Sequence, residues 1–170
     1  MSPQSNRVVE LRIPSELGYE KIAREAVATV ADRLNFSEEK VEDIKTAISE
    51  ACTNAIRYGS GSDARMKVVV ILTADEDKLD ILIKDPGASG TPPVNVNIPD
   101  INGMVEGKHR LGGMGLYIIR ELVDEAGFVE PVDEDEGNQF RMVIYRVGDG
   151  DEDGDKSAAP ESGTDNGGTT

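Results

Sequence analysis

The pattern of apolar and polar residues predicts strands and helices that follow one another in mixed order. "RVVELRIP" (7–14) alternates and then meets proline, which is typical of a strand and its end. A helix is expected from Ser15 and Glu16 through about Leu34, with an apolar stripe at four-residue spacing. That stripe comprises Ile22, Ala26, Val30 and Leu34. A second helix is expected to be capped by Ser37 and to end near Gly59. Its apolar seam comprises Val41, Ile44, Ile48, Cys52 and Ala55.

The second half of the domain reads mainly as paired strands. "RMKVVVILTA" and "KLDILIKD" are separated by the short turn "DED". After a long irregular segment, a helix is expected from Met114 to about Ala126. "GFVEPV" and "NQFRMVIYRV" then flank the acidic hairpin loop "DEDEG". Strands that come as hairpin pairs predict an α/β two-layer sandwich, with a mostly antiparallel mixed sheet packed against helices.

Composition divides the chain into three parts. Residues 148–170 hold seven acidic residues, one lysine and no aromatic or branched aliphatic residue, which predicts a disordered acidic tail. Residues 1–7 are expected to be a flexible N-terminus, and residues 8–147 a single folded domain.

The charge and the cysteine count narrow the classes of function. A formal net charge of -15 disfavours binding to nucleic acid or to an anionic membrane and favours a protein partner. No signal peptide or membrane span is recognised, and the single cysteine, Cys52, excludes an internal disulfide. These features predict a cytoplasmic protein, with Cys52 in the core.

Two polar residues stand out in "ISEACTNAIRYG" (48–59). Glu50 and Asn54 are four residues apart and therefore share one helix face. A carboxylate can accept a proton, and an amide oxygen suits a hard metal ion such as Mg²⁺. A solvated helix face is the simpler explanation when the pair is taken alone.

Two further segments suggest a ligand site. Asp85 ends a strand and precedes Pro86 and Gly87, where it could accept a hydrogen bond from a ligand amine or simply form a turn. The segment from Pro86 to Gly113 is long for an irregular connection, and such segments are often functional. It ends in a glycine-rich helix start, which can cradle a phosphate but can also be a flexible turn.

Three motifs in this order carry a resemblance. "EACTNAIRYG", "DPGASG" and "RLGGMGLY" are similar to the ATP-binding motifs of the GHKL superfamily, which includes gyrase, MutL and histidine kinases. The chain most resembles the RsbW-like bacterial anti-sigma factors that are serine-protein kinases, over about residues 8–147. One departure is Ser89, which replaces the second glycine of the superfamily's D-x-G-x-G pattern.

The resemblance implies a role for each matching residue. Glu50 would be the catalytic base, Asn54 the Mg²⁺ ligand and Asp85 the acceptor for the adenine amine, with Gly87 beside the base. Arg110 would reach the γ-phosphate, and Arg24 would contact a protein partner. The residues implied along the phosphates are Gly112, Gly113, Gly115 and Leu116.

The implied activity is that of a homodimeric anti-sigma factor with kinase activity. It would use ATP and Mg²⁺ to phosphorylate a serine or threonine of an anti-anti-sigma (STAS-type) protein, and it would sequester a sigma factor to repress transcription. The alternative is an ATP-binding regulatory module without phosphate transfer. A sensor histidine kinase core is disfavoured, because His109, the only histidine, lies in the long irregular segment.

Overall fold

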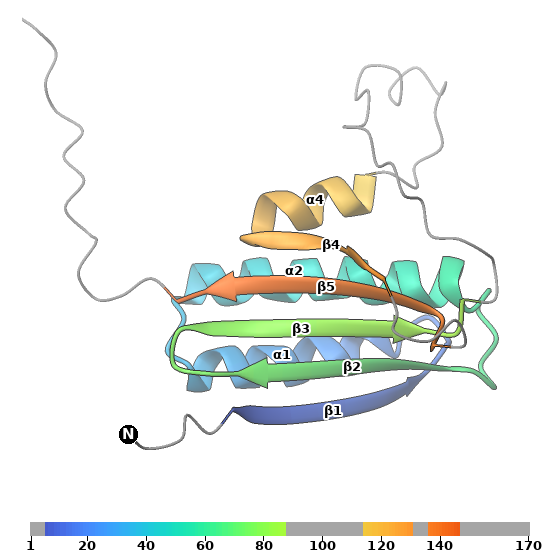
Figure 1. Ribbon diagram of the computed structural model, residues 1–170, viewed down its shortest axis with the longest axis horizontal. Coiled ribbons are helices and arrows are strands. Elements are labelled where there is room, and N and C mark those ends of the chain that lie inside the picture. The colour runs from blue at the N-terminus through green and yellow to red at the C-terminus, as the bar shows by residue number, and fades with distance from the viewer. Residues whose placement is uncertain (1–5, 88–113, 131–135, 147–170) are drawn as a thin grey trace, which may run out of the picture.

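The sheet of this protein is antiparallel throughout the part of the chain described. The computed structural model describes residues 6–87, 114–130 and 136–146. Five strands pair in the order β1-β2-β3-β5-β4, so β5 lies between β3 and β4 (Figure 1). The strands are β1 (Arg7–Pro14), β2 (Lys67–Ala74), β3 (Lys78–Asp85), β4 (Glu125–Val129) and β5 (Asn138–Tyr145).

Helices cover one face of the sheet. The helical elements are α1 (Glu20–Arg33), α2 (Glu38–Asn54), the π-helical turn η1 (Ala55–Gly59) and α4 (Met114–Leu122). Figure 1 shows α1 and α2 behind the sheet, with α4 beyond β4 at one edge. This is the predicted two-layer α/β sandwich. None of the described helices combines the length and apolarity needed to cross a lipid bilayer.

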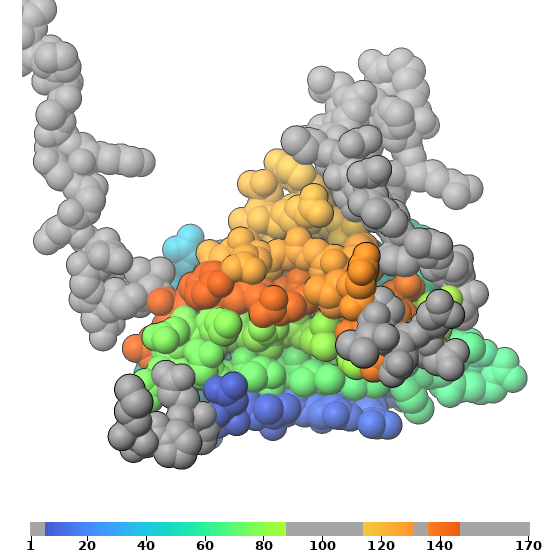
Figure 2. All heavy atoms as spheres, viewed as in Figure 1, coloured from blue at the N-terminus to red at the C-terminus, as the bar shows by residue number. Residues whose placement is uncertain are grey.

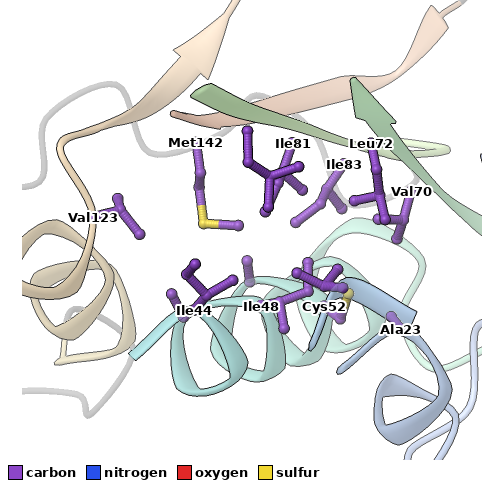
Figure 3. Close-up of a cluster of buried hydrophobic side chains, with 14 of the residues drawn as sticks. Ala23, Ile44, Ile48, Cys52, Val70, Leu72, Ile81, Ile83, Val123 and Met142 are labelled. Carbon is purple, nitrogen blue, oxygen red and sulfur yellow. The ribbon is translucent and has the colours of Figure 1, made fainter. Parts of the chain in front are cut away.

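The core lies between the sheet and α2, as Figure 3 shows. The predicted α2 seam is confirmed, because all five of its residues are buried. Opposite them, alternate residues of the central strands point inward, namely Val70, Leu72, Ile81, Ile83 and Met142. Each buried aliphatic side chain of this size contributes about 1.5–3 kcal/mol. Burial also raises the pKa of the Cys52 thiol to about 12, so Cys52 is a core residue rather than a reactive thiol.

The predicted start of the first helix is wrong, and its predicted stripe is confirmed only towards the end of the helix, where Val30 packs against the core and Leu34 is buried. The helix begins at Glu20, because the Ser15 amide donates to the Met66 carbonyl and so prolongs the β1–β2 pairing. Ile22 is 52% exposed, whereas the buried side of the helix comprises Ala23, Val27, Ala28 and Ala31. The helix therefore packs through small residues, and its large aliphatic residue faces outward.

The predicted end of the helix that begins at Met114, α4, is also wrong. The helix stops at Leu122, and Ala126 belongs to β4. Lys40 Nζ donates to the Leu122 carbonyl, which satisfies one of the last carbonyls of the helix. The Asp124 amide donates to the Val143 carbonyl, so pairing with β5 begins where the helical pattern in the sequence still continues.

The face of the sheet opposite α1 and α2 is the one that Figure 2 shows. Cross-strand charge pairing occurs on this face, where Arg141 Nε lies 3.0 Å from Asp80 Oδ1. Pairs that remain in contact with solvent add little to stability. Glu50 and Asn54 of the predicted site lie elsewhere, near the C-terminal end of α2.

The N-terminal cap of α2 gives a first prediction. Ser37 Oγ accepts a hydrogen bond of 3.2 Å from the Lys40 amide, as the sequence predicted. We expect Ser37→Ala to lower the free energy of unfolding by about 1 kcal/mol, measured by urea denaturation. Ser37→Asp keeps a capping oxygen and should stay near wild type. An equal loss in both variants would contradict the role of the cap.

Candidate functional site

Glu50 and Asn54 lie on one face of α2 against the start of α4. Both side chains are half-buried. A Cβ atom added to Gly115 would lie 3.0 Å from Glu50 Oε2 and 3.2 Å from Asn54 Nδ2. The polar pair therefore faces the first turn of another helix and is not a fully solvated stripe. Any residue larger than glycine at position 115 would press on both side chains.

The first turn of α4 is held in place by its apolar side. Leu116 and Ile119 are buried in the core, while Gly115 is turned towards α2. Exposed amides at a helix start favour negative charge, so this turn is suited to bind an anion next to Glu50 and Asn54. The preceding residues of the motif, Arg110, Gly112 and Gly113, lie outside the described residues, as does His109.

A π-helical turn connects this polar pair to the second part of the site. η1 follows Asn54 directly, and the Ser60 amide donates to the Ala55 carbonyl five residues earlier. At its end, Gly59 lies so close to Asp85 that an added Cβ would overlap the carboxyl carbon and both carboxyl oxygens. Single π turns in helices are frequent at functional sites. Here the turn brings the backbone at Gly59 against the strand-end acid.

The Asp85 carboxylate is held by two hydrogen bonds to the same oxygen. The Gly87 amide donates to Oδ1 at 2.8 Å, and Asn138 Nδ2 donates to Oδ1 at 3.1 Å. Gly87 has a φ of 68°, a conformation that favours glycine. Burial raises the pKa of Asp85, and the two hydrogen bonds oppose that rise. Neither of these two donors contacts Oδ2.

Three residues around Asp85 were not predicted from the sequence. Gly59 was interpreted only as the end of a helix, and Gly137 and Asn138 only as the border of a hairpin loop. Asn138 is the register partner of Asp85 in the β3–β5 ladder, and a Cβ on Gly137 would overlap the Asp85 carbonyl. Knowledge of which strands pair would have exposed Asn138, but that pairing spans 53 residues of sequence.

The structure therefore groups most of the described candidate residues at one end of the α2–η1 segment. Glu50, Asn54 and Gly115 form one cluster, with Leu116 next in the chain. Asp85 and Gly87 form a second cluster with Gly59 and Asn138. Arg24 is separate: it lies on α1, and its Nε is 3.1 Å from Glu25 Oε1.

The two clusters offer complementary chemistry. The first combines a carboxylate that can accept a proton, an amide oxygen that suits Mg²⁺ and a helix start that favours phosphate. The second presents a hydrogen-bond acceptor in a half-buried position. A ligand with a polyphosphate at one end and an amine-bearing ring at the other matches this arrangement.

Comparison with known proteins agrees with this description. The family described as "Histidine kinase-like ATPase domain" matches residues 13–144. The serine-protein kinase RsbW of Bacillus mycoides is 35% identical over 140 residues, which are 81% of this chain and 84% of that protein. The RsbW of Bacillus cereus is 34% identical over the same shares of both chains.

Solved structures with low sequence identity share the fold. The RsbU and RsbW domains of a Mycobacterium tuberculosis protein align with a TM-score of 0.57 at 16% identity, over 83% of this chain and 33% of that longer chain. The SiaB–SiaC complex of Pseudomonas aeruginosa aligns with a TM-score of 0.54 at 15% identity, over 84% of this chain and 92% of the matched one. Because the family model and the RsbW relatives match most of its length, the chain belongs to the histidine kinase-like ATPase domain family, within its RsbW-like group of serine-protein kinases.

Proposed function

We propose that this protein binds ATP with Mg²⁺ and phosphorylates a serine or threonine of an anti-anti-sigma protein. We propose further that it sequesters a sigma factor and so represses transcription. The observation that carries the proposal is the approach of Gly115 to both Glu50 and Asn54. A nucleotide lying along the α2–η1 segment would contact all three sequence motifs, although they are far apart in the chain.

The described residues suit both ATP and Mg²⁺. Gly115 leaves space that a Cβ would fill, next to a carboxylate and an amide. Mg²⁺ commonly takes one or two protein oxygens and completes its shell with phosphate and water, so Asn54 Oδ1 would be sufficient as a protein ligand. At the other end, Asp85 Oδ2 would accept a hydrogen bond from the adenine amine. The bound metal would offset the charge of the phosphates.

Glu50 would act on the partner's hydroxyl group. Its carboxylate would take the hydroxyl proton as the serine oxygen forms a bond to the γ-phosphorus. The bond between that phosphorus and the oxygen bridging to the β-phosphate would break, and ADP would leave with the electron pair. Arg110 would stabilise the charge that develops on the γ-phosphate. The products are ADP and the phosphorylated partner.

The partners proposed for this chain follow from its relatives. The RsbW relatives are serine-protein kinases, and we extend that activity to this chain with a STAS-type protein as acceptor. The net charge of -15 suits a basic patch on a sigma factor through electrostatic steering. Arg24 on α1 is the proposed partner contact, and a homodimer in the cytoplasm is the proposed state.

A phosphate-transfer assay tests this function. The protein is incubated with γ-labelled ATP, Mg²⁺ and STAS-type proteins encoded beside it, and label is followed on the partner. We expect labelled serine or threonine, and loss of label when EDTA removes the metal. Binding of ATP without labelling of any partner would instead favour a regulatory ATP-binding module.

Binding measurements test the metal and sigma-factor assignments separately. Asn54→Ala should weaken nucleotide affinity in the presence of Mg²⁺ and leave the affinity in EDTA nearly unchanged, because it removes a metal ligand. An equal loss in both conditions would argue against that role.

Arg24→Ala should weaken capture of a sigma factor or the STAS-type partner without changing affinity for ATP.

A further inference from the structure

Asp85 is enclosed by three features that come from different parts of the fold. Gly59 approaches it from η1, Gly87 from the turn after β3, and Asn138 from the start of β5. The proposed function uses Asp85 and Gly87 but assigns nothing to Gly59 or Asn138. Each of these two residues restricts the carboxylate in a different way.

Gly59 restricts the space available to the carboxylate. A Cβ at this position would overlap the carboxyl carbon and both oxygens of Asp85, whereas the φ of Gly59 is not in the left-handed region. The glycine is therefore required by its contact with Asp85 and not by its own backbone conformation. An alanine here would displace the end of the Asp85 side chain and leave the local backbone unstrained.

Asn138 restricts which oxygen of the carboxylate is free. Its Nδ2 donates to Oδ1, the same oxygen that accepts from the Gly87 amide. Neither of these two donors contacts Oδ2, and an oxygen of an ionised carboxylate can only accept hydrogen bonds. An acceptor discriminates between ring substituents, because it attracts an amine and repels a carbonyl oxygen.

We propose that Gly59 and Asn138 are positioning residues that determine base specificity, by fixing Asp85 so that the site accepts a 6-amino purine and rejects a 6-oxo purine. The inference rests on the proposed function, since it assumes that a purine nucleotide lies at Asp85. It goes further by placing the specificity in two residues that need not touch the base. Loss of either residue should reduce discrimination more than it reduces binding through the phosphates.

The probes are ATP and inosine triphosphate, in which a 6-oxo group replaces the 6-amino group and N1 carries a hydrogen. A hydrogen bond to a charged acceptor accounts for roughly a tenfold to hundredfold difference in affinity. We therefore expect wild type to bind ATP about 10 to 100 times more tightly than inosine triphosphate, measured by calorimetry with Mg²⁺. Because both probes carry the same triphosphate, a substitution that changes only phosphate binding leaves the ratio of the two affinities unchanged.

Two variants and a matched control test the positioning roles. Gly59→Ala and Asn138→Asp should each bring the affinity ratio close to one, the latter because an aspartate keeps the shape but loses the donor. The control is Gly127→Ala in β4, where an added Cβ would meet no atom within 4 Å. Gly127→Ala should keep the wild-type ratio.

A double-mutant cycle covers the case in which Gly59→Ala affects folding. Alanine is the better helix former, so a lower Tm in Gly59→Ala would report overlap with another group. We expect that loss of Tm to be larger in wild type than in the Asp85→Ala background, where the carboxylate is absent. An equal loss in both backgrounds would overturn the role of Gly59.

The outcomes separate this inference from the function on which it rests. If wild type prefers ATP and both variants keep that preference, the positioning roles are wrong while ATP binding stands. If wild type binds both nucleotides equally, Asp85 does not read the base, and the inference fails with it. If wild type binds neither, the proposed function itself is overturned, and this inference falls too. The inference is supported only if wild type prefers ATP and the affinity ratio falls close to one in both variants.

Discussion

Glu50→Gln is expected to slow phosphate transfer to the partner by about 10²- to 10⁴-fold, the usual contribution of a general base. Glutamine keeps the size of the side chain beside Gly115 but cannot accept the proton of the serine hydroxyl. Because the carboxylate is not proposed to hold the nucleotide, ATP affinity should stay close to that of wild type. The measurement is the initial rate of partner labelling at saturating ATP and Mg²⁺, with ATP affinity determined separately.

Glu42→Gln is the matched control for Glu50→Gln. Glu42 lies on the same helix and is exposed, and its Oε1 is 2.6 Å from Lys45 Nζ. Removing an exposed charge of this kind changes little. If Glu50→Gln transferred phosphate as fast as Glu42→Gln, Glu50 would not be the base. A loss of ATP affinity with an unchanged rate at saturation would assign Glu50 to binding instead.

The parts of the fold predicted correctly are those in which local pattern and burial agree. The apolar seam of α2 repeats along a helix of 17 residues, so the predicted buried face does not depend on any single position. The β2 and β3 strands are short segments rich in valine, isoleucine and leucine on either side of a short turn, which made both the strands and their antiparallel pairing predictable.

The wrong predictions concern segments whose structure depends on small residues or on contacts between residues that are distant in the sequence. The buried side of α1 is made mostly of alanines, which carry a weak apolar signal, so the larger Ile22 was wrongly placed inside. The end of α4 depends on Lys40 and on pairing with β5, and neither is visible in the sequence around Leu122. Tertiary contacts override the local pattern at both places.

The same distinction applies to the site. Glu50, Asn54 and Asp85 could be proposed from their residue types, their spacing and the family resemblance. The surroundings of Asp85 could not, because a glycine chosen for close approach looks in sequence like any turn glycine. The pairing of Asp85 with Asn138 likewise depends on β5 lying next to β3, although α4 and β4 intervene in the chain.

Asp85→Asn should reverse the base preference of the site. Asparagine keeps the shape, and its Oδ1 can still accept from Gly87 and Asn138, so its amide nitrogen takes the place of Oδ2. A donor at that point repels the adenine amine and attracts a 6-oxo group. We expect ATP affinity to fall by roughly 10- to 100-fold or more, and inosine triphosphate to become the preferred ligand. Calorimetry with both nucleotides measures the switch, and an unchanged preference for ATP would contradict the role of Asp85.

The same variant should make the nucleotide-free protein more stable at neutral pH. Burial raises the pKa of Asp85 in the folded protein above its ordinary value of 3.8, so the ionised carboxylate disfavours folding. The favourable contribution of the protonated form is complete below 3.8 and is lost as pH rises through the raised pKa. Asp85→Asn should therefore have the higher Tm at neutral pH, and its advantage should vanish as pH falls through that range. A Tm difference that stays constant down to acid pH would show that ionisation of Asp85 is not its cause.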